Sequence, residues 1–518
     1  MNLIDRPTDP AAQKRNLAVT GIMLVIFLFA IDSTIVSTSM PTIVAKLGGL
    51  ELYSWVFSIY MLTSALTTPI FGKLADLYNR RNLMLVGIGI FVVGSTLCGA
   101  ASNMELMILF RAIQGLGGGA IYALAFIIVG IIYPADKRAK MQGIISSIWG
   151  LSSILGPLAG GIIVENWSWR WIFFVNLPVT AAASALIVLG LKETETITQR
   201  LKLDLLGSAT LLVALMLLFY ALSHSAHARQ PLNAELAVLF ALAVLLLVIF
   251  LIIERRAEEP IIPLDLFRVR LFRTCTAVAA LASMGVFGAV SYLPLYVQGV
   301  LGLTASRAGL VLLVLSLGWT AGSLLAGRWI NRLGYRFVAA VGMALLALGY
   351  SLFIFPKSVL GIGAVVLSAI FIGIGMGFAN LTTLVAAQTA VWTHRIGVAT
   401  STLMLFRTFG GAFAVSLMGT VLLHQMQKGL SQIGGATDNP LSTVAKEKLA
   451  HPHNLLEPAT RALIPPEFLP KLVAALGSAI EFAFLTMFIL MLLGIVTSRF
   501  MGQYTPTSTP RPGESSQP

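Results

Sequence analysis

Apolar runs of about 20 residues or more recur along the whole chain, and this is the length that an α-helix needs to cross a bilayer. The composition agrees, because 57% of the 518 residues are hydrophobic and only 11% are charged, whereas about 25% are charged in an ordinary soluble protein. The runs predict a polytopic helical membrane protein with about fourteen spans. The predicted spans are 17–41, 52–72, 82–101, 104–132, 140–164, 169–191, 204–223, 233–253, 272–300, 304–328, 336–355, 358–389, 396–424 and 474–500.

A short sequence pattern occurs twice. Gly72–Arg81 reads Gly-Lys-Leu-Ala-Asp-Leu-Tyr-Asn-Arg-Arg, and Gly327–Arg336 reads Gly-Arg-Trp-Ile-Asn-Arg-Leu-Gly-Tyr-Arg. Such internal repeats are typical of secondary transporters, whose substrate site lies near the bilayer midplane between the repeats. We therefore expect an all-α membrane fold with two six-helix halves and two extra central helices. Its predicted parts are a cytoplasmic N-terminus (1–15), an N-terminal six-helix bundle (16–191), two linker helices with cytoplasmic links (192–271), a C-terminal six-helix bundle (272–500) with an extracytoplasmic insert (425–473), and a disordered cytoplasmic tail (501–518).

The net charge of +13 does not point to a nucleic-acid partner, because the basic residues lie mostly in short links between apolar runs. Lys and Arg concentrate in the cytoplasmic links of membrane proteins. When the N-terminus is placed in the cytoplasm, most of the 35 Lys and Arg residues fall on that side. We therefore expect both termini to be cytoplasmic.

Ionisable residues inside the spans of the first half suggest proton coupling. Asp32 lies about 14 Å from the outer end of its span, and Arg111 lies about 10 Å from the outer end of its own. Asn176 and the bend at Gly156 and Pro157 come to a similar depth. A nearby cation favours the charged form of a carboxylate and desolvation favours the neutral form, so we hypothesise that Asp32 exchanges a coupling proton and Arg111 sets its affinity. The alternative is a fixed ion pair that only holds helices together.

Other residues within the spans are candidates for binding. Glu481 could carry a second proton, bind a cationic substrate or pair with a neighbour. Arg407 lies near mid-span, where a charge needs a cavity or a partner, and Gln114 lies one turn from Arg111 and could orient it. Met and aromatic side chains adapt to varied ligands, although ordinary helix packing explains each of them as readily. The candidates for the substrate cavity are Gln114, Trp149, Asn176, Phe27, Phe57, Tyr60, Met61, Met404, Phe406 and Arg407.

Two segments suggest conformational switching. Gly150–Gly161 holds small residues at helical spacing, which let helix backbones approach closely, and Pro157 permits a bend. In the link Gly72–Arg81, Asp76 can accept hydrogen bonds from amides at a neighbouring helix end, and the final arginines can bind carbonyls or acids. The alternative is a solvated link, and the second copy has Asn331 in place of Asp76. The predicted switch residues are Gly72, Asp76, Arg80, Arg81, Gly150, Gly156, Pro157, Gly160 and Gly161.

The sequence contains no convincing enzyme motif. It lacks a phosphate-binding Gly-Lys-Ser/Thr loop, a His-Glu-x-x-His pattern and a paired-cysteine metal motif. Cys98 and Cys275 fall in apolar runs and are expected to be packing residues. We therefore expect no enzymatic activity, no metal and no cofactor, with the energy coming from an ion gradient, for which the Asp32 hypothesis names the proton, or from the substrate's own gradient.

The link Gly72–Arg81, the segment Arg111–Gly115 and the run Gly150–Gly161 together resemble the major facilitator superfamily. Asn79 stands where the superfamily pattern has glycine. The resemblance covers nearly the whole chain and extends to the fourteen-helix drug:proton antiporter branch. The segments that are similar to this branch are Asp32–Val36 with Pro41, Trp169–Pro178 and Glu254–Pro260.

The resemblance implies a monomeric multi-pass protein of the bacterial inner membrane that exports hydrophobic, often cationic, drugs in exchange for protons and so confers antibiotic resistance. It implies that Asp32 and Arg111 take part in proton coupling. It also implies that Gly150–Gly161 favours antiport and that Asp76 and Arg80 govern the conformational switch.

Other functions remain open at this stage. One is export or flipping of a lipid or another endogenous amphiphile, with the insert 425–473 docking an outer partner. A uniporter or nutrient symporter should show more polar side chains in its spans. A receptor or scaffold that moves nothing is a further alternative, because a fold does not determine a function.

Overall fold

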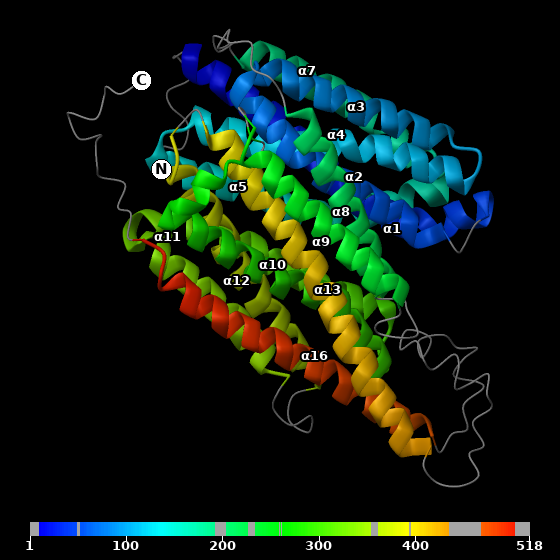
Figure 1. The fold of residues 1–518 in the computed structure, drawn as a ribbon. Coiled ribbons are helices and arrows are strands. Elements are labelled where there is room, and N and C mark those ends of the chain that lie inside the picture. Colours follow the sequence, from blue (N-terminus) through cyan, green and yellow to red (C-terminus); the bar gives the residue numbers. More distant parts are fainter. Residues whose placement is uncertain are drawn as a thin grey trace.

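The computed structural model describes residues 10–48, 52–191, 204–225, 234–257, 260, 262–353, 361–392, 395–434 and 468–502. The regular structure in these residues is helical (Figure 1), which confirms the predicted all-α class. The elements are α1 (Pro10–Leu47), α2 (Tyr53–Leu77), α3 (Arg80–Ala100), α4 (Met104–Ile132), α5 (Ala135–Asn166), α6 (Trp171–Phe174), α7 (Asn176–Gly190), α8 (Leu205–Ser225), α9 (Ala234–Glu254), η2 (Leu264–Arg268), α10 (Arg270–Leu295), η3 (Tyr296–Val300), α11 (Ala305–Ser351), α12 (Gly361–Thr389), α13 (Ile396–Gly434) and α16 (Leu469–Ser498).

Eleven helical segments in this part of the chain are long and apolar enough, by length and composition, to cross a membrane. α5 is not among them, and α8 contributes only the shorter apolar stretch Ala209–Leu218. The predicted spans 304–328 and 336–355 are the two arms of α11, which meet at Gly334 with φ 77° and ψ 164°. Glycine suits this break because it adopts a positive φ without steric cost.

Several helix ends differ from the predicted span ends. α5 begins at Ala135, so most of the link predicted at 133–140 is helical. The span predicted at 169–191 is divided into α6 and α7, which are separated at Val175. An apolar run marks the depth of a bilayer, whereas a helix ends where its backbone hydrogen bonding ends, and polar helix formers extend it beyond the apolar run.

The predicted outer insert 425–473 is helical at both ends. α13 continues to Gly434, and α16 already begins at Leu469. The parts of the predicted regions that lie outside the described residues are 1–9, 49–51, 192–203, 226–233, 258–259, 261, 354–360, 393–394, 435–467 and 503–518.

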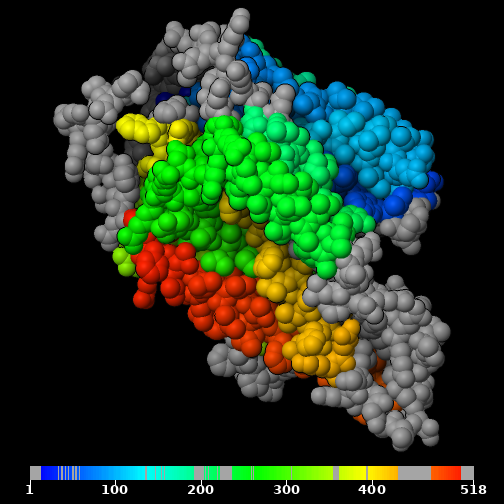
Figure 2. Space-filling view, in the orientation of Figure 1, coloured from blue at the N-terminus to red at the C-terminus, as the bar shows by residue number. Residues whose placement is uncertain are grey.

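The helices form two groups that meet along two seams. α1–α7 pack against one another, and α10–α16 do the same. Between the groups, α5 packs on α11 and α12, while α13 packs on α2 and α4. α8 and α9 pair with each other on the outside, across the seam between α2 and α13 (Figures 1 and 2). The apolar side chains that join these helices include Leu66, Leu211, Leu215, Phe250 and Leu405.

Glycines place α4 directly against two neighbouring helices. A Cβ on Gly119 would lie 2.1 Å from the carbonyl oxygen of Ser64 in α2, and a Cβ on Gly117 would lie 2.3 Å from the amide nitrogen of Phe91 in α3. Ser64 Oγ also donates a hydrogen bond to the carbonyl oxygen of Gly115 at 2.9 Å. In a bilayer such close approach is a main source of helix association, so α4 has a defined depth and rotation.

Gly119→Ala should lower the free energy of unfolding by about 1–3 kcal/mol, because the added methyl group would overlap the α2 backbone. Gly89→Ala on α3 is the matched control, because no atom lies within 4 Å of the added Cβ. This variant should raise the free energy of unfolding by about 0.5–1 kcal/mol, since alanine favours a helix more than glycine does. Thermal unfolding of the detergent-solubilised protein measures both. Equal melting temperatures for the two variants would contradict the close approach.

Candidate functional site

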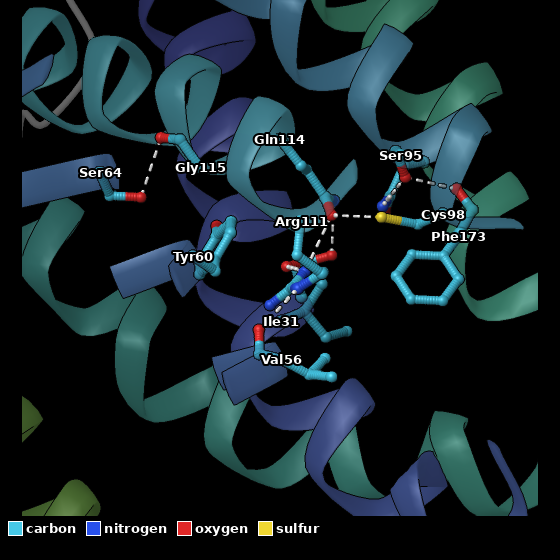
Figure 3. Close-up of polar contacts among 12 residues, drawn as sticks. Ile31, Val56, Tyr60, Ser64, Ser95, Cys98, Arg111, Gln114, Gly115 and Phe173 are labelled. Atoms are coloured by element: carbon cyan, nitrogen blue, oxygen red, sulfur yellow. Dashed lines mark hydrogen bonds and ion pairs between the residues drawn. The ribbon is translucent and has the colours of Figure 1, made fainter. Parts of the chain in front are cut away.

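Asp32 on α1 is bound by two side chains of α4, Arg111 and Gln114 (Figure 3). Arg111 Nη1 donates to Asp32 Oδ2 at 2.6 Å, and Gln114 Nε2 donates to Asp32 Oδ1 at 2.8 Å. Arg111 Nη1 also donates to Gln114 Oε1 at 2.8 Å. Positions three apart on a helix share a face, so α4 presents both donors to one carboxylate. The three side chains are fully buried, and we call them the Asp32 triad.

α2 completes the surroundings of Arg111. Its Nε donates to the carbonyl oxygen of Val56 at 3.4 Å, and its Cζ lies 4.0 Å from the centre of the Tyr60 ring. A guanidinium over an aromatic face is attracted by the ring quadrupole. Among the described residues, neither Arg111 Nη2 nor Tyr60 Oη has a hydrogen-bond partner. In this part of the chain the cation therefore retains one donor group, Nη2, without a hydrogen-bond acceptor.

The triad is a closed arrangement. Both carboxylate oxygens of Asp32 already accept a hydrogen bond, and 0% of the residue is exposed. A buried ion pair overcomes its desolvation cost only with good geometry and further hydrogen bonds, and Gln114 supplies these here. Exchange of a proton with solvent at Asp32 therefore requires the surrounding helices to move.

Asn176 does not contact the Asp32 triad, although its predicted depth in the membrane is similar to that of Asp32 and Arg111. Its Nδ2 donates to Ser95 Oγ at 2.9 Å, and Ser95 Oγ donates to the carbonyl oxygen of Phe173 at 2.9 Å. Asn176 is 1% exposed and lies in the contact between α3 and α7. The predicted depth of Asn176 assumed that the span 169–191 is one continuous helix, whereas α7 begins at Asn176 itself. The amide that reaches Asp32 is that of Gln114.

One half of the glycine-rich run in α5 contacts α1. A Cβ on Gly156 would lie 1.9 Å from Thr34 Oγ1. Thr34 Oγ1 donates to the carbonyl oxygen of Ser152 at 3.2 Å, and Ser152 Oγ donates to that of Phe27 at 3.5 Å. Thr34 lies two positions after Asp32, so a bend in α5 would act on the helix that carries the carboxylate.

The other end of this run contacts the second group of helices. A Cβ on Gly150 would lie 2.0 Å from Thr320 Oγ1 in α11. Gly160 is buried, whereas no atom lies within 4 Å of a Cβ added to Gly161, and Pro157 lies within α5. α5 therefore touches α1 and α11 through glycines of the same run.

An aromatic cluster lies beside the triad. The Phe29 ring stacks on Tyr122 at 5.4 Å, lies 5.9 Å from Tyr60 and meets Trp149 edge-on at 5.8 Å. Tyr122 also meets Trp149 and Phe126 edge-on, at 6.2 and 5.4 Å. Sequence analysis identified Tyr60 and Trp149 but missed Phe29 and Tyr122. Tyr122 could have been found, because it follows Arg111 by about three helical turns and so shares its face.

The other predicted members of the adaptable pocket lie in several places, and Phe27 and Met404 share the main apolar core with Phe29 and Tyr60. Met61 is 47% exposed, and Phe57 packs in a separate apolar cluster. Phe406 packs on Phe267 at 5.7 Å, while Met404 is buried in the main core at 2% exposure. A span that is apolar on all sides gives no signal for the direction of a side chain, so residue type alone does not predict which of these side chains lie together, and their role in a substrate cavity stays a prediction.

Arg407 on α13 contacts α12 and α4. Its Nη2 donates to the carbonyl oxygen of Asn380 and, at 3.0 Å, to Thr383 Oγ1. Tyr122 lies close enough to act on it electrostatically. The sequence predicted a cavity or a partner for Arg407 without naming one, and Asn380 and Thr383 accept its hydrogen bonds. Glu481 on α16 instead lies near Tyr296, among the C-terminal helices.

Asp76 at the end of α2 binds the start of α13. Its Oδ1 accepts from the amide of Gly397 and its Oδ2 from that of Val398, both at 2.9 Å. A Cβ on Gly72 would lie 2.0 Å from Ser401 Oγ, so the two helices are in close contact. Free amides and the positive end of the helix dipole favour an anion at a helix N-terminus. The predicted hydrogen bonds are therefore present, and their role in switching stays a prediction.

The two copies of the repeated pattern turn differently. Asn79 caps α3 with φ −59°, and its side chain accepts from the amide of Arg81 at 2.9 Å. The corresponding residue of the second copy, Gly334, has φ 77°. Asparagine thus replaces glycine in the first copy by capping rather than by adopting a positive φ. Arg80 lies close enough to interact electrostatically with Asp76.

A second polar contact between the two helix groups joins α5 to α12 and was not predicted from the sequence. Gln142 Nε2 on α5 donates to Gln388 Oε1 on α12 at 2.9 Å and to the carbonyl oxygen of Phe126 at 3.1 Å. Gln388 Nε2 donates to Thr400 Oγ1 on α13 at 3.1 Å. Both glutamines are at most 1% exposed. Amides inside apolar spans are costly without partners, and that signal could have identified them.

The family model of the Major Facilitator Superfamily matches residues 22–415. This chain belongs to the major facilitator superfamily. It is 37% identical over 410 residues to the multidrug transporter protein MdtP of Bacillus subtilis, covering 79% of this chain and 75% of that protein. It is 34% identical over 489 residues to multidrug resistance protein 3 of the same organism, covering 94% of each.

Solved structures of the superfamily share the fold. The human organic anion transporter MFSD10 (TETRAN) has a TM-score of 0.59 at 16% identity, covering 93% of this chain and 100% of that chain. Together with the family match, this likeness makes the chain a multi-pass membrane transporter of the superfamily.

The Asp76 contact predicts a change in backbone dynamics. Asp76→Ala removes the acceptor of both amides, so amide hydrogen exchange across residues 396–401 should accelerate about tenfold or more. Mass spectrometry of the corresponding peptide measures this rate. Asn331→Ala, at the matching position of the second copy, should leave it unchanged. Equal exchange in wild type and Asp76→Ala would show that Asp76 does not hold the start of α13.

The Asp32 triad predicts non-additive effects on stability. Asp32→Leu and Arg111→Met should each lower the free energy of unfolding by about 3–5 kcal/mol, because each leaves the partner charge buried and unpaired. The double variant leaves no orphan charge and should be more stable than either single variant. Unfolding in mixed micelles tests this. Additive losses would mean that the two charges do not depend on each other.

Proposed function

We propose that the protein exports hydrophobic drugs or similar amphiphiles across the inner membrane by exchange for protons, using alternating access. The observation that carries this proposal is the burial of Asp32 between Arg111 and Gln114, next to an aromatic cluster to which α1 contributes Phe29 and α4 contributes Tyr122. A carboxylate inside a membrane span is costly and therefore marks an ion or proton pathway. The names of the curated relatives, which are multidrug transporters, support the same function.

The triad suggests how a proton would be linked to movement. A proton on Asp32 neutralises the carboxylate, so Arg111 loses its counter-charge and keeps only Gln114, the Val56 carbonyl and the Tyr60 ring as partners. An unpaired buried guanidinium is unstable, which favours a state in which α1 and α4 separate or admit water. Loss of the proton restores the ion pair and the closed arrangement. Proton release and substrate release would then use opposite movements of one helix pair.

Fourteen spans fit the helices. The eleven apolar segments become fourteen when α5 and α8 are added and the two arms of α11 are counted separately. The Lys and Arg bias supports cytoplasmic termini. With that orientation the Asp76 contact lies on the cytoplasmic side and holds α2 against α13 there. The boundaries of the halves at 16–191 and 272–500 remain part of the proposal.

The proposal is tested in proteoliposomes with an imposed pH gradient, a panel of fluorescent lipophilic probes and a pH dye inside the vesicles. Wild type should move probe and protons in opposite directions. Asp32→Asn should abolish gradient-driven accumulation to the level of empty liposomes but still allow exchange of probe down its own gradient. Asp265→Asn is the matched control, because its carboxylate is 50% exposed and lies outside the triad.

Two outcomes contradict this function. Full gradient-driven transport by Asp32→Asn would remove Asp32 from the coupling mechanism. Failure of wild type to move any probe would support a lipid exporter, if labelled lipid is translocated, or a protein that binds without transporting.

A further inference from the structure

Arg407 is a buried cation that forms no ion pair with an acid in the part of the chain that the structure describes. It is 7% exposed, and the two groups that accept hydrogen bonds from it, the Asn380 carbonyl and the Thr383 hydroxyl, are neutral. Its Nε has no hydrogen-bond partner among the described residues. Tyr122 and Cys275, the side chains that act on it electrostatically, are also neutral at physiological pH. The guanidinium therefore keeps its positive charge and an unused donor inside the helix bundle.

Asp32 and Asp76, two acids of the first helix group, are bound to other groups. In the described part of the chain, Asp32 forms its ion pair with Arg111. Both oxygens of Asp76 accept from backbone amides of α13. The charge of Arg111 is thus balanced inside the bundle, whereas that of Arg407 is not. Burial of an unbalanced charge is unfavourable, and a bound anion would relieve it.

The surroundings of Arg407 suit the apolar part of a ligand. Tyr122 connects the cation to the aromatic cluster, because its ring stacks on Phe29 and lies edge-on to Trp149. Tyr122 and Trp149 are both half-buried, so they are not sealed inside the packing as the triad is. The position is also central, since α13 packs on α4 from the other helix group.

We propose that Arg407 and Tyr122 form a subsite for an aromatic anion, with a carboxylate or sulfonate bound by the guanidinium and the apolar part packed against Phe29, Tyr122 and Trp149. This subsite specifies a substrate class for the proposed function. Transport of the anion rests on the proposed function, whereas binding of the anion does not. It departs from the cationic substrates that the sequence resemblance implies. A lipophilic cation would meet uncompensated positive charge at Arg407, while a neutral analogue would gain only the aromatic contacts.

The test uses equilibrium dialysis of the purified full chain in detergent, without a pH gradient. The probes share one ring system and differ in charge: naphthylacetate, naphthylethanol and naphthylethylammonium. In wild type, naphthylacetate should bind about tenfold or more tightly than naphthylethylammonium, with naphthylethanol between them. Arg407→Gln should lower the affinity for naphthylacetate about tenfold and change the affinity for naphthylethanol by less than about twofold.

Two further variants keep the result interpretable. Arg407→Lys retains the charge and should retain the preference for the anion, even if Arg407→Gln is poorly folded. Arg273→Gln removes an exposed arginine of α10 and should bind all three probes as wild type does. Equal binding of anion and cation by wild type, an equal loss of all three probes in Arg407→Gln, or no binding of any probe would overturn the subsite.

The result separates the subsite from the transport proposal. Selective anion binding without pH-driven flux would uphold the subsite and contradict proton-coupled export. Flux of cations driven by the pH gradient, without selective binding of the anion, would uphold export and overturn the subsite.

Discussion

The positive charge of Arg111 inside an apolar helix bundle is the constraint on which the rest of this structure depends. An orphan charge at this depth costs several kcal/mol, so the fold must bring an acid to it. Asp32 is that acid, and Gln114 satisfies the oxygen that the arginine leaves free. This requirement determines how α1 and α4 are rotated toward each other. The polar contact specifies which apolar surfaces meet, although apolar packing supplies most of the contact area.

α4 links the polar site to the aromatic cluster. Arg111, Gln114 and Tyr122 share one face of this helix, and the glycines between them allow α2 and α3 to approach its backbone closely. Because packed backbones resist small deformations, α4 moves as a unit. A change in charge at the triad and a change of ligand beside Tyr122 therefore act on the same rigid element. This provides a physical path between proton and substrate that needs no direct contact between them.

The closed side of the molecule is held by contacts of two kinds. Asp76 uses a full charge against the amides at the start of α13, whereas Gln142 and Gln388 use neutral amide hydrogen bonds across α5, α12 and α13. The neutral network is buried, so each member broken without replacement leaves an unsatisfied polar group. Opening this side must break both kinds of contact together, which favours two discrete states over a continuous range.

Local rules made part of this protein predictable from its sequence. The bilayer sets the length of a span, so the apolar runs located most of the helices, and the cost of intramembrane charge singled out Asp32, Arg111 and Arg407. The direction of each side chain and the residue it contacts were not predictable. A span that is apolar on all sides does not show which of its faces packs against which neighbouring helix. Asn176 therefore bonds to Ser95 rather than to the group in which it was predicted, and the contact of Gln142 with Gln388 was not predicted. The sequence by itself determined which residues could not remain alone in the bilayer; only helix rotation and packing in the tertiary structure decided that Arg111 is neutralised by Asp32 while Arg407 is not.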